Sequence, residues 1–136
     1  MLLNKFFSIS SVNEFREENQ PSIDSNHKHL VRVDINPDHS IFKGHFPGNP
    51  VVPGVCQIQM VTEILGEIHH KKIWLAYADN IKFLSMINPV AKGSFSFELN
   101  YRLISDEEMD VTAVAFKDQI PFLKIKAIYK SSDLNN

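Results

Sequence analysis

One short segment of the chain combines a titratable side chain with a backbone stiffened by proline. Residues 44–55 read Gly-His-Phe-Pro-Gly-Asn-Pro-Val-Val-Pro-Gly-Val and contain three prolines, three glycines and one histidine, His45. Because proline lacks an N–H group and glycine weakens regular elements, most of this segment can be neither a helix nor a central strand. Imidazole titrates near neutral pH, so His45 on a rigid loop is suited to proton transfer.

A helix is predicted directly after this loop, over about residues 54–69. Apolar residues recur at helical spacing from Val55 to Leu65, and neither glycine nor proline interrupts them before Gly66. The helix is apolar on most of its circumference, so we expect it to be buried. An imidazole next to a helix N-terminus is a favourable arrangement for proton transfer beside a carbonyl group, whose developing negative charge the helix end stabilises.

Most of the remaining chain alternates between apolar and polar residues, as strands do. Strands are predicted at about residues 29–36, 73–83, 94–104, 109–117 and 121–130. Residues 1–10 are predicted to form a short strand or helix, and residues 11–26 a surface turn or short helix. One buried helix with about five antiparallel strands indicates an α+β fold whose sheet wraps the helix. Such a sheet leaves its other face open, so we expect a dimer that closes it.

Composition limits the possible functions. The chain has 136 residues, enough for one domain with its own core, and a formal net charge of -2, which argues against a general nucleic-acid binder. No apolar run approaches the roughly 20 residues of a membrane span. The N-terminus lacks a clear signal-peptide cleavage site. The single cysteine, Cys56, excludes an internal disulfide and fits a reducing compartment, so we expect a cytoplasmic protein.

The loop at residues 44–55 resembles the signature of the β-hydroxyacyl-acyl-carrier-protein dehydratases, the hot-dog-fold family of fatty acid synthesis. Residues 80–83 (Asn-Ile-Lys-Phe) and 88–93 (Asn-Pro-Val-Ala-Lys-Gly) look like that family's second segment, a strand ending in Lys-Phe followed by a Pro-Val-x-x-Gly turn. The order of the predicted elements agrees with the hot-dog fold over about residues 28–130. We therefore expect a single hot-dog domain over residues 1–136, with an antiparallel sheet around one long central helix, closed by dimerisation.

The resemblance implies dehydration of 3-hydroxyacyl thioesters to trans-2-enoyl thioesters in fatty acid or related polyene or lipid synthesis. It implies an acyl-carrier protein as partner, a homodimer or trimer of dimers, and no cofactor or metal. Carried over from the family, His45 exchanges a proton at the α-carbon of the thioester and the backbone carbonyl of Val51 orients its imidazole. The N–H group of Gly54 binds the thioester carbonyl, and Val55 adjoins it in the same substrate-binding turn.

The chain departs from the family at the second catalytic group. The family has Asp or Glu fourteen residues after the histidine, where this chain has Gln59, and usually Gln four residues further on, where it has Glu63. Positions four apart share one helix face, so both side chains are expected to reach the same cavity. Three hypotheses follow: Glu63 has taken the acid role with Gln59 as its polar neighbour; His45 acts alone with Gln59 orienting water or substrate; or catalysis is lost and the protein binds acyl chains or supports a catalytic partner.

Two other hot-dog classes are alternatives. The motif Asp34-x-Asn36-Pro37-x-His39 is similar to the core of the (R)-specific enoyl hydratases, although a strand-ending Asn-Pro turn explains the same residues. Hot-dog thioesterases form the other class, because Glu63 could activate water at the carbonyl.

The remaining candidates are predicted to be structural. His27 and His29 are predicted to be surface residues, and Cys56 a small packing residue. The run of residues 69–72, His-His-Lys-Lys, is predicted to be a solvated helix end, where cations are favoured by the helix dipole, because no carboxylate or thiol completes a set of metal ligands.

Overall fold

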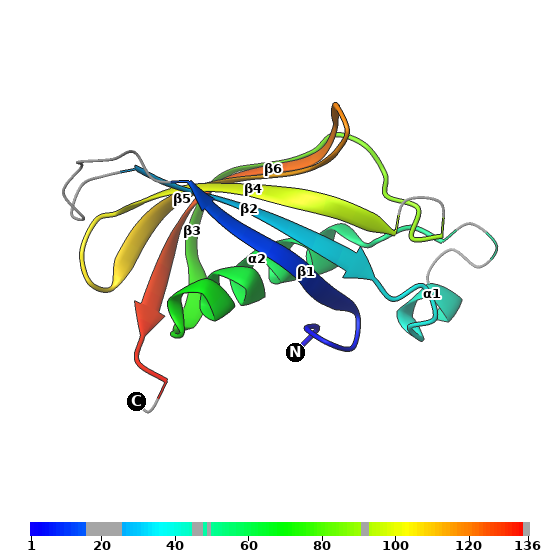
Figure 1. Ribbon diagram of the computed structural model, residues 1–136, viewed down its shortest axis with the longest axis horizontal. Coiled ribbons are helices and arrows are strands. Elements are labelled where there is room, and N and C mark those ends of the chain that lie inside the picture. Colours follow the sequence, from blue (N-terminus) through cyan, green and yellow to red (C-terminus); the bar gives the residue numbers. More distant parts are fainter. Residues whose placement is uncertain (16–25, 45–47, 49, 91–92, 135–136) are drawn as a thin grey trace.

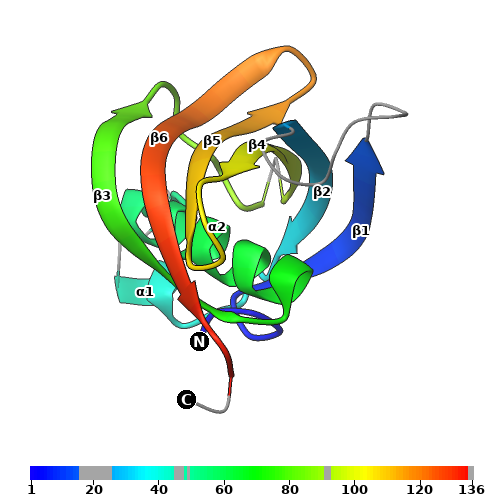
Figure 2. The same ribbon diagram turned by 90° about the vertical axis from the view of Figure 1, so that its left-hand side faces the viewer.

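A single antiparallel sheet curves around one long helix. A computed structural model describes residues 1–15, 26–44, 48, 50–90 and 93–134. The elements in this part are β1 (Phe7–Phe15), β2 (Asn26–Ile35), α1 (Ile41–Gly44), α2 (Gly54–His69), β3 (Lys72–Phe83), β4 (Ser94–Leu103), β5 (Glu108–Lys117) and β6 (Ile120–Ser132). The strand order is β1-β2-β4-β5-β6-β3, with α2 on the concave side (Figure 1, Figure 2). This confirms the predicted α+β hot-dog architecture.

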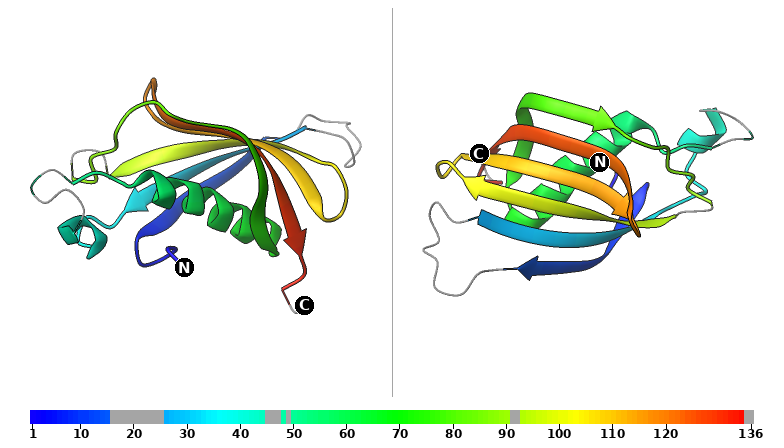
Figure 3. Two further views of the ribbon diagram at one scale, coloured as in Figure 1. Left: turned by 180° about the vertical axis from the view of Figure 1, so that it is seen from behind. Right: turned by 90° about the horizontal axis from the view of Figure 1, so that it is seen from above.

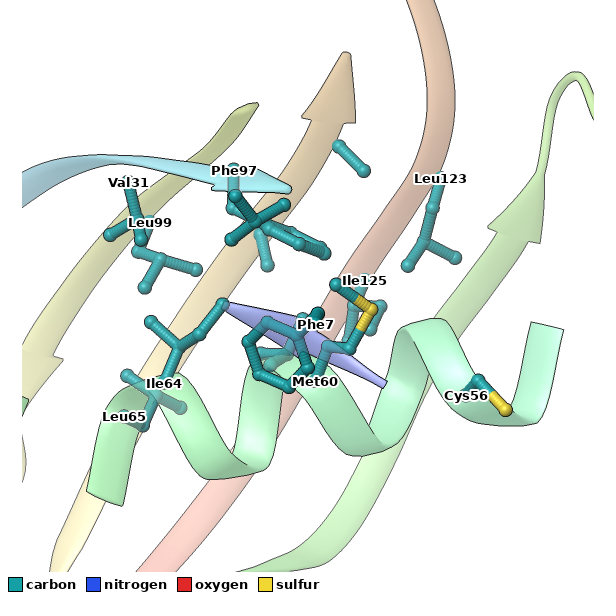
Figure 4. Close-up of a cluster of buried hydrophobic side chains, with 14 of the residues drawn as sticks. Phe7, Val31, Cys56, Met60, Ile64, Leu65, Phe97, Leu99, Leu123 and Ile125 are labelled. Atoms are coloured by element: carbon teal, nitrogen blue, oxygen red, sulfur yellow. The ribbon is translucent and has the colours of Figure 1, made fainter. Parts of the chain in front are cut away.

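Helix α2 begins at the predicted residue, Gly54, because Pro53 precedes it. Pro53 is the N-cap residue, with an extended backbone (φ -60°, ψ 144°), and His70 ends the helix in the left-handed conformation (φ 53°), its N–H donating to the Gly66 carbonyl. Met60 and Ile64 project from α2 into the sheet and are fully buried (Figure 4). Each such side chain contributes roughly 1.5–3 kcal/mol through burial. Packing against the sheet, more than local propensity, therefore holds the helix.

The inner face of the sheet follows the predicted alternation. Phe97 and Leu99 of β4 and Ile125 of β6 lie on the side of the sheet that faces α2 and are completely buried (Figure 4), and Val111 of β5 is completely buried as well. The intervening residues of β4 and β5 point outward and are mostly polar and half-buried. These outer side chains are compatible with water. The dimer that closes this face stays a prediction.

The two edges of the sheet are β1 and β3 (Figure 3). Residues 11–15 belong to β1, so the prediction of a turn or short helix over residues 11–26 is wrong for that part. Most of β1 is exposed, and among the strands of the described residues β1 pairs with β2. A strand without a buried face has no hydrophobic alternation, so the sequence pattern did not reveal it.

Exposed apolar side chains follow the other edge. Trp74 and Tyr77 of β3 are 41% and 64% exposed, and Met86, after the strand, is 78% exposed. Strand β3 also carries two register shifts against β6. Part of the exposed apolar surface of the described residues therefore lies along this edge strand. In the described residues, no helix has the length and apolar character needed to cross a membrane.

Candidate active site

The loop with the predicted catalytic histidine leads into the start of α2. His45 lies outside the described residues, so its role remains a prediction. Residues 50–53, just before α2, belong to no helix or strand, as the sequence predicted. Val52 is buried, and its N–H donates to the Ile87 carbonyl at 2.9 Å. This bond ties the loop to the segment that follows β3.

The first turn of α2 presents two N–H groups without an acceptor among the described residues, those of Gly54 and Val55. The next two N–H groups, of Cys56 and Gln57, both donate to the Pro53 carbonyl, at 3.0 and 3.1 Å. The two unpaired donors and the positive end of the helix dipole form a site that favours negative charge on a bound oxygen. Such a site is suited to a thioester carbonyl that becomes enolate-like.

The Phe83 ring packs directly against Gly54. A Cβ atom at residue 54 would lie 2.6 Å from both Cε1 and Cζ of Phe83. Only glycine fits there with the ring in this position. Phe83 ends β3, so the structure brings the Lys-Phe segment against the start of the helix. Sequence reasoning named both segments without predicting this contact.

Glu63 is almost completely buried, at 8% exposure, although it is charged. Its Oε1 accepts hydrogen bonds from the N–H groups of Leu2 and Leu3, at 2.9 and 2.8 Å. Its Oε2 accepts one from Leu2 at 3.0 Å and one from Gln59 Nε2 at 3.0 Å. All of these groups donate to the carboxylate, so the N-terminal segment satisfies a buried charge that would otherwise destabilise the fold.

Gln59 and Glu63 line one cavity of about 450 Å³, together with Met1, Thr62, Gly66 and Ile73 among others. Gln59 is exposed, whereas Glu63 is buried beneath the N-terminal segment. The chain's N-terminus lies beside α2 in two views (Figure 1, Figure 2). The amide and the carboxylate therefore form a hydrogen-bonded pair. Whether the carboxylate acts as an acid remains a prediction.

The Asn36-Pro37 motif makes a turn, as the structural interpretation predicted. Asn36 Oδ1 accepts the Asp38 N–H at 3.0 Å, and its Nδ2 donates to the Lys5 carbonyl at 3.0 Å. His39 Nδ1 accepts the Ile41 N–H at 3.1 Å, at the start of α1. These side chains are therefore engaged in shaping the end of β2.

Two predictions about histidines are wrong. His29 is buried, at 4% exposure, because the register that turns Val31 and Val33 inward also turns His29 inward. Its ring stacks on Tyr101 at 5.5 Å, and Nε2 lies 3.8 Å from Glu14 Oε2. His69, predicted to be solvated, packs edge-on against the same tyrosine at 5.0 Å. Burial, followed by the charges of His29 and other neighbours, lowers the pKa of His69 to about 4.

Cys56 is buried, as predicted for a packing residue, and burial raises the pKa of its thiol. Gln57, also buried, was missed by the sequence analysis. The available signal was a polar residue on the same helix face as Met60, Val61 and Ile64. Within the described part of the chain, no three His, Cys, Asp or Glu side chains are grouped so that they could hold a metal ion.

Comparisons with known proteins agree with this geometry. A family model described as ApeI dehydratase matches residues 20–117. The 3-hydroxyacyl-[acyl-carrier-protein] dehydratase FabZ of Rickettsia bellii (strain OSU 85-389) is 31% identical over 77 residues, covering 42% of this chain and 53% of that protein. The chain spans about half the length of the curated relatives it matches.

Two solved structures share the fold. The dehydratase heterocomplex ApeI:P from Xenorhabdus doucetiae has a TM-score of 0.62 and 20% identity, covering 88% of this chain and 98% of that chain. A putative thioesterase, yhdA, from Lactococcus lactis has a TM-score of 0.65 and 10% identity, covering 90% and 92%. Because the family model spans well over half of its residues, this chain belongs to the ApeI-like dehydratase family.

Proposed function

We propose that this protein dehydrates 3-hydroxyacyl thioesters, carried by an acyl-carrier protein, to trans-2-enoyl thioesters. The observation that carries the proposal is the pair of N–H groups of Gly54 and Val55, which have no acceptor among the described residues and follow His45 by nine and ten residues. The 31% identity with a FabZ dehydratase over part of the chain supports the same reaction class. The single cysteine fits the cytoplasm, where we place the reaction.

In this proposal, His45 removes a proton from the α-carbon, with its imidazole oriented by the Val51 carbonyl. The electron pair of the broken C–H bond forms the Cα–Cβ double bond, and the Cβ–O bond breaks. The N–H of Gly54, with Val55 beside it, stabilises negative charge on the thioester oxygen as the proton leaves. A proton delivered to the departing hydroxyl releases water. Each step uses only groups of the chain and the substrate.

Glu63 is the proposed donor of that last proton. Gln59 is the polar neighbour whose amide holds the Glu63 side chain by a hydrogen bond. The carboxylate accepts the N–H groups of Leu2 and Leu3 in this structure. Glu63 can reach a substrate hydroxyl only if the N-terminal segment leaves it. This requirement also favours a second candidate function. In it, the Glu63 carboxylate stays bound to the N-terminal segment, and the chain is a non-catalytic subunit that supports a catalytic partner. The ApeI:P dehydratase of Xenorhabdus doucetiae is a heterocomplex, which is a precedent for that arrangement within the fold.

We propose further that two copies pair along β3, as a dimer or within a trimer of dimers. Trp74, Tyr77 and Phe83 leave apolar surface open on this edge strand. An unpaired edge with exposed aromatic residues is a surface that a second strand covers readily.

The test is conversion of a medium-chain 3-hydroxyacyl-acyl-carrier protein to the enoyl form by the purified chain, followed by mass spectrometry. We expect turnover by the wild type and a loss on the order of 10²–10⁴-fold in His45→Ala. Release of a free thiol instead would indicate a thioesterase. No reaction by the wild type, with turnover restored by a second subunit, would indicate the supporting role.

A further inference from the structure

We propose that Gln57 is a positioning residue that holds the backbone between the loop and α2 in its reactive geometry, an inference that rests on the proposed dehydratase function. Gln57 lies in the first turn of α2 and is 3% exposed. Its Nε2 donates to the Val52 carbonyl at 3.3 Å, five residues earlier. Its Oε1 is buried and has no hydrogen-bond partner among the described atoms.

The unpaired oxygen indicates that this glutamine does not serve stability. A buried amide oxygen without a partner destabilises the folded state, and an apolar side chain of the same length would avoid that loss. Its neighbours on the same helix face, Met60, Val61 and Ile64, are apolar and fully buried. The Nε2 group of Gln57 does form a hydrogen bond, and its acceptor, the Val52 carbonyl, belongs to the loop before α2.

Three consecutive peptide units are held in this region. The N–H of Val52 donates to the Ile87 carbonyl, the Val52 carbonyl accepts from Gln57, and the Pro53 carbonyl accepts from Cys56 and Gln57. In a trans peptide unit the C=O and N–H groups point in opposite directions. Holding the Val52 N–H therefore aims the Val51 carbonyl, and holding the Pro53 carbonyl aims the Gly54 N–H. Gln57 secures the unit between these two.

Backbone groups and Gln57 therefore have separate roles at the site. The Val51 carbonyl and the Gly54 N–H are the two backbone groups that the proposed mechanism uses, and they flank the bond that Gln57 makes. Gln57 need not touch the substrate. It acts through the backbone, so its loss should lower kcat while leaving KM nearly unchanged.

The test compares Gln57→Met and Gln57→Leu, which remove the amide but keep much of the volume, with Met60→Leu, a matched core change on the same helix. Three quantities are measured in each variant: melting temperature, steady-state kinetics with a 3-hydroxyacyl-acyl-carrier protein, and hydrogen exchange at the amides of Val52, Cys56 and Gln57. We expect the Gln57 variants to melt no lower than wild type, to lose kcat on the order of 10–100-fold with KM within about twofold, and to exchange faster at these amides. Met60→Leu should leave the kinetics and these amides unchanged.

A Gln57 variant that keeps wild-type kcat and wild-type exchange would overturn the proposal, and so would one that melts lower with unchanged kcat. If the wild type shows no turnover, the proposed function fails. Hydrogen exchange alone then decides whether Gln57 holds the backbone between the loop and α2. Faster exchange at Val52 and Cys56 in the Gln57 variants than in Met60→Leu supports the positioning role. Equal exchange overturns it.

Discussion

Gln59 and Glu63 are hydrogen-bonded to each other across one turn of α2, with Gln59 Nε2 donating to Glu63 Oε2 at 3.0 Å. The resemblance described above predicts a carboxylate at the first of these positions and usually an amide at the second, so on that prediction this chain holds the same two groups in reverse order. The reversal has a structural consequence. The carboxylate at residue 63 accepts from Leu2 and Leu3 with Oε1 and from Leu2 and Gln59 with Oε2. An amide has one acceptor oxygen and would lose the bonds to the second.

Replacing Glu63 by Gln tests two roles of this side chain together: donation of a proton, and binding of the N-terminal backbone, which we call anchoring. We expect turnover to be lost, because an amide cannot deliver a proton, and the free energy of unfolding to fall by roughly 1–3 kcal/mol as charge-assisted bonds weaken. Kinetics and chemical denaturation measure the two effects.

Deletion of residues 1–3 separates these roles, because it removes the docked backbone and keeps the carboxylate. If Glu63 is the acid, the deletion variant should retain turnover. An equal loss of kcat in the deletion variant and in Glu63→Gln would assign Glu63 to anchoring alone.

Gln59→Glu restores a carboxylate at the family position. Turnover should rise if the chain is a weakened member of the family. The two carboxylates one turn apart would repel, and this lowers stability by roughly 0.2–0.5 kcal/mol. The measurement is kcat beside the melting temperature, with Gln59→Ala as control. An unchanged or lower kcat in Gln59→Glu would argue against the weakened-enzyme interpretation.

Gly54→Ala should lower both stability and activity. A Cβ there would lie 2.6 Å from two atoms of the Phe83 ring, so the ring must move, at about 1–3 kcal/mol for overpacking. Alanine is otherwise the better helix former, so the loss must come from this contact. A double-mutant cycle with Phe83→Ala checks the cause. The double variant should recover much of the stability, and additive losses would show that Phe83 is not responsible.

Acidification should destabilise the protein through His69. Its pKa is about 4 in the folded state and 6.5 ordinarily, because burial, and then the charge of His29, disfavour the imidazolium form. Between these values the unfolded chain binds the proton and the folded chain does not, so stability falls as pH falls from 6.5 towards 4. The slope is at most about 1.4 kcal/mol per pH unit, reduced by partial solvent exposure.

Melting temperatures measured from pH 7.5 to 4.5 test this effect. His69→Phe keeps an aromatic ring against Tyr101 and should flatten the curve. A curve as steep as that of the wild type would mean that other groups dominate.

Dimerisation along β3 makes a separate prediction. Tyr77→Glu places a charge on this edge and should shift the protein to a monomer in light scattering coupled to size exclusion. Val12→Glu, on the opposite edge strand β1, is the matched control, since Val12 is 46% exposed and Tyr77 is 64% exposed. A monomer in the control, or a dimer in Tyr77→Glu, would contradict pairing through β3.

Elements with one buried face could be predicted from the sequence. The observed bounds of α2, Gly54–His69, coincide with the predicted helix, and β4 begins at Ser94 as its alternation predicted. Strand β1 was predicted only in part, as a short strand or helix over residues 1–10, and residues 11–15 were missed. Backbone pairing with β2 stabilises this strand, and most of its side chains are exposed, so they show no hydrophobic pattern. The inward direction of His29 was also missed, because register, not residue type, decides which face a strand residue occupies.

By itself, the sequence determined the loop before α2, the helix that follows and the family they indicate, since proline, glycine and helical periodicity act over a few residues. Tertiary structure alone decided which groups meet: Phe83 over Gly54, Gln57 at the Val52 carbonyl, and Leu2 and Leu3 at Glu63. The contacts of Phe83 and of the N-terminus join residues far apart in the chain. The bond of Gln57 depends on how the sheet buries that helix face. Local patterns carry no information about such distances, because packing of the whole chain sets them.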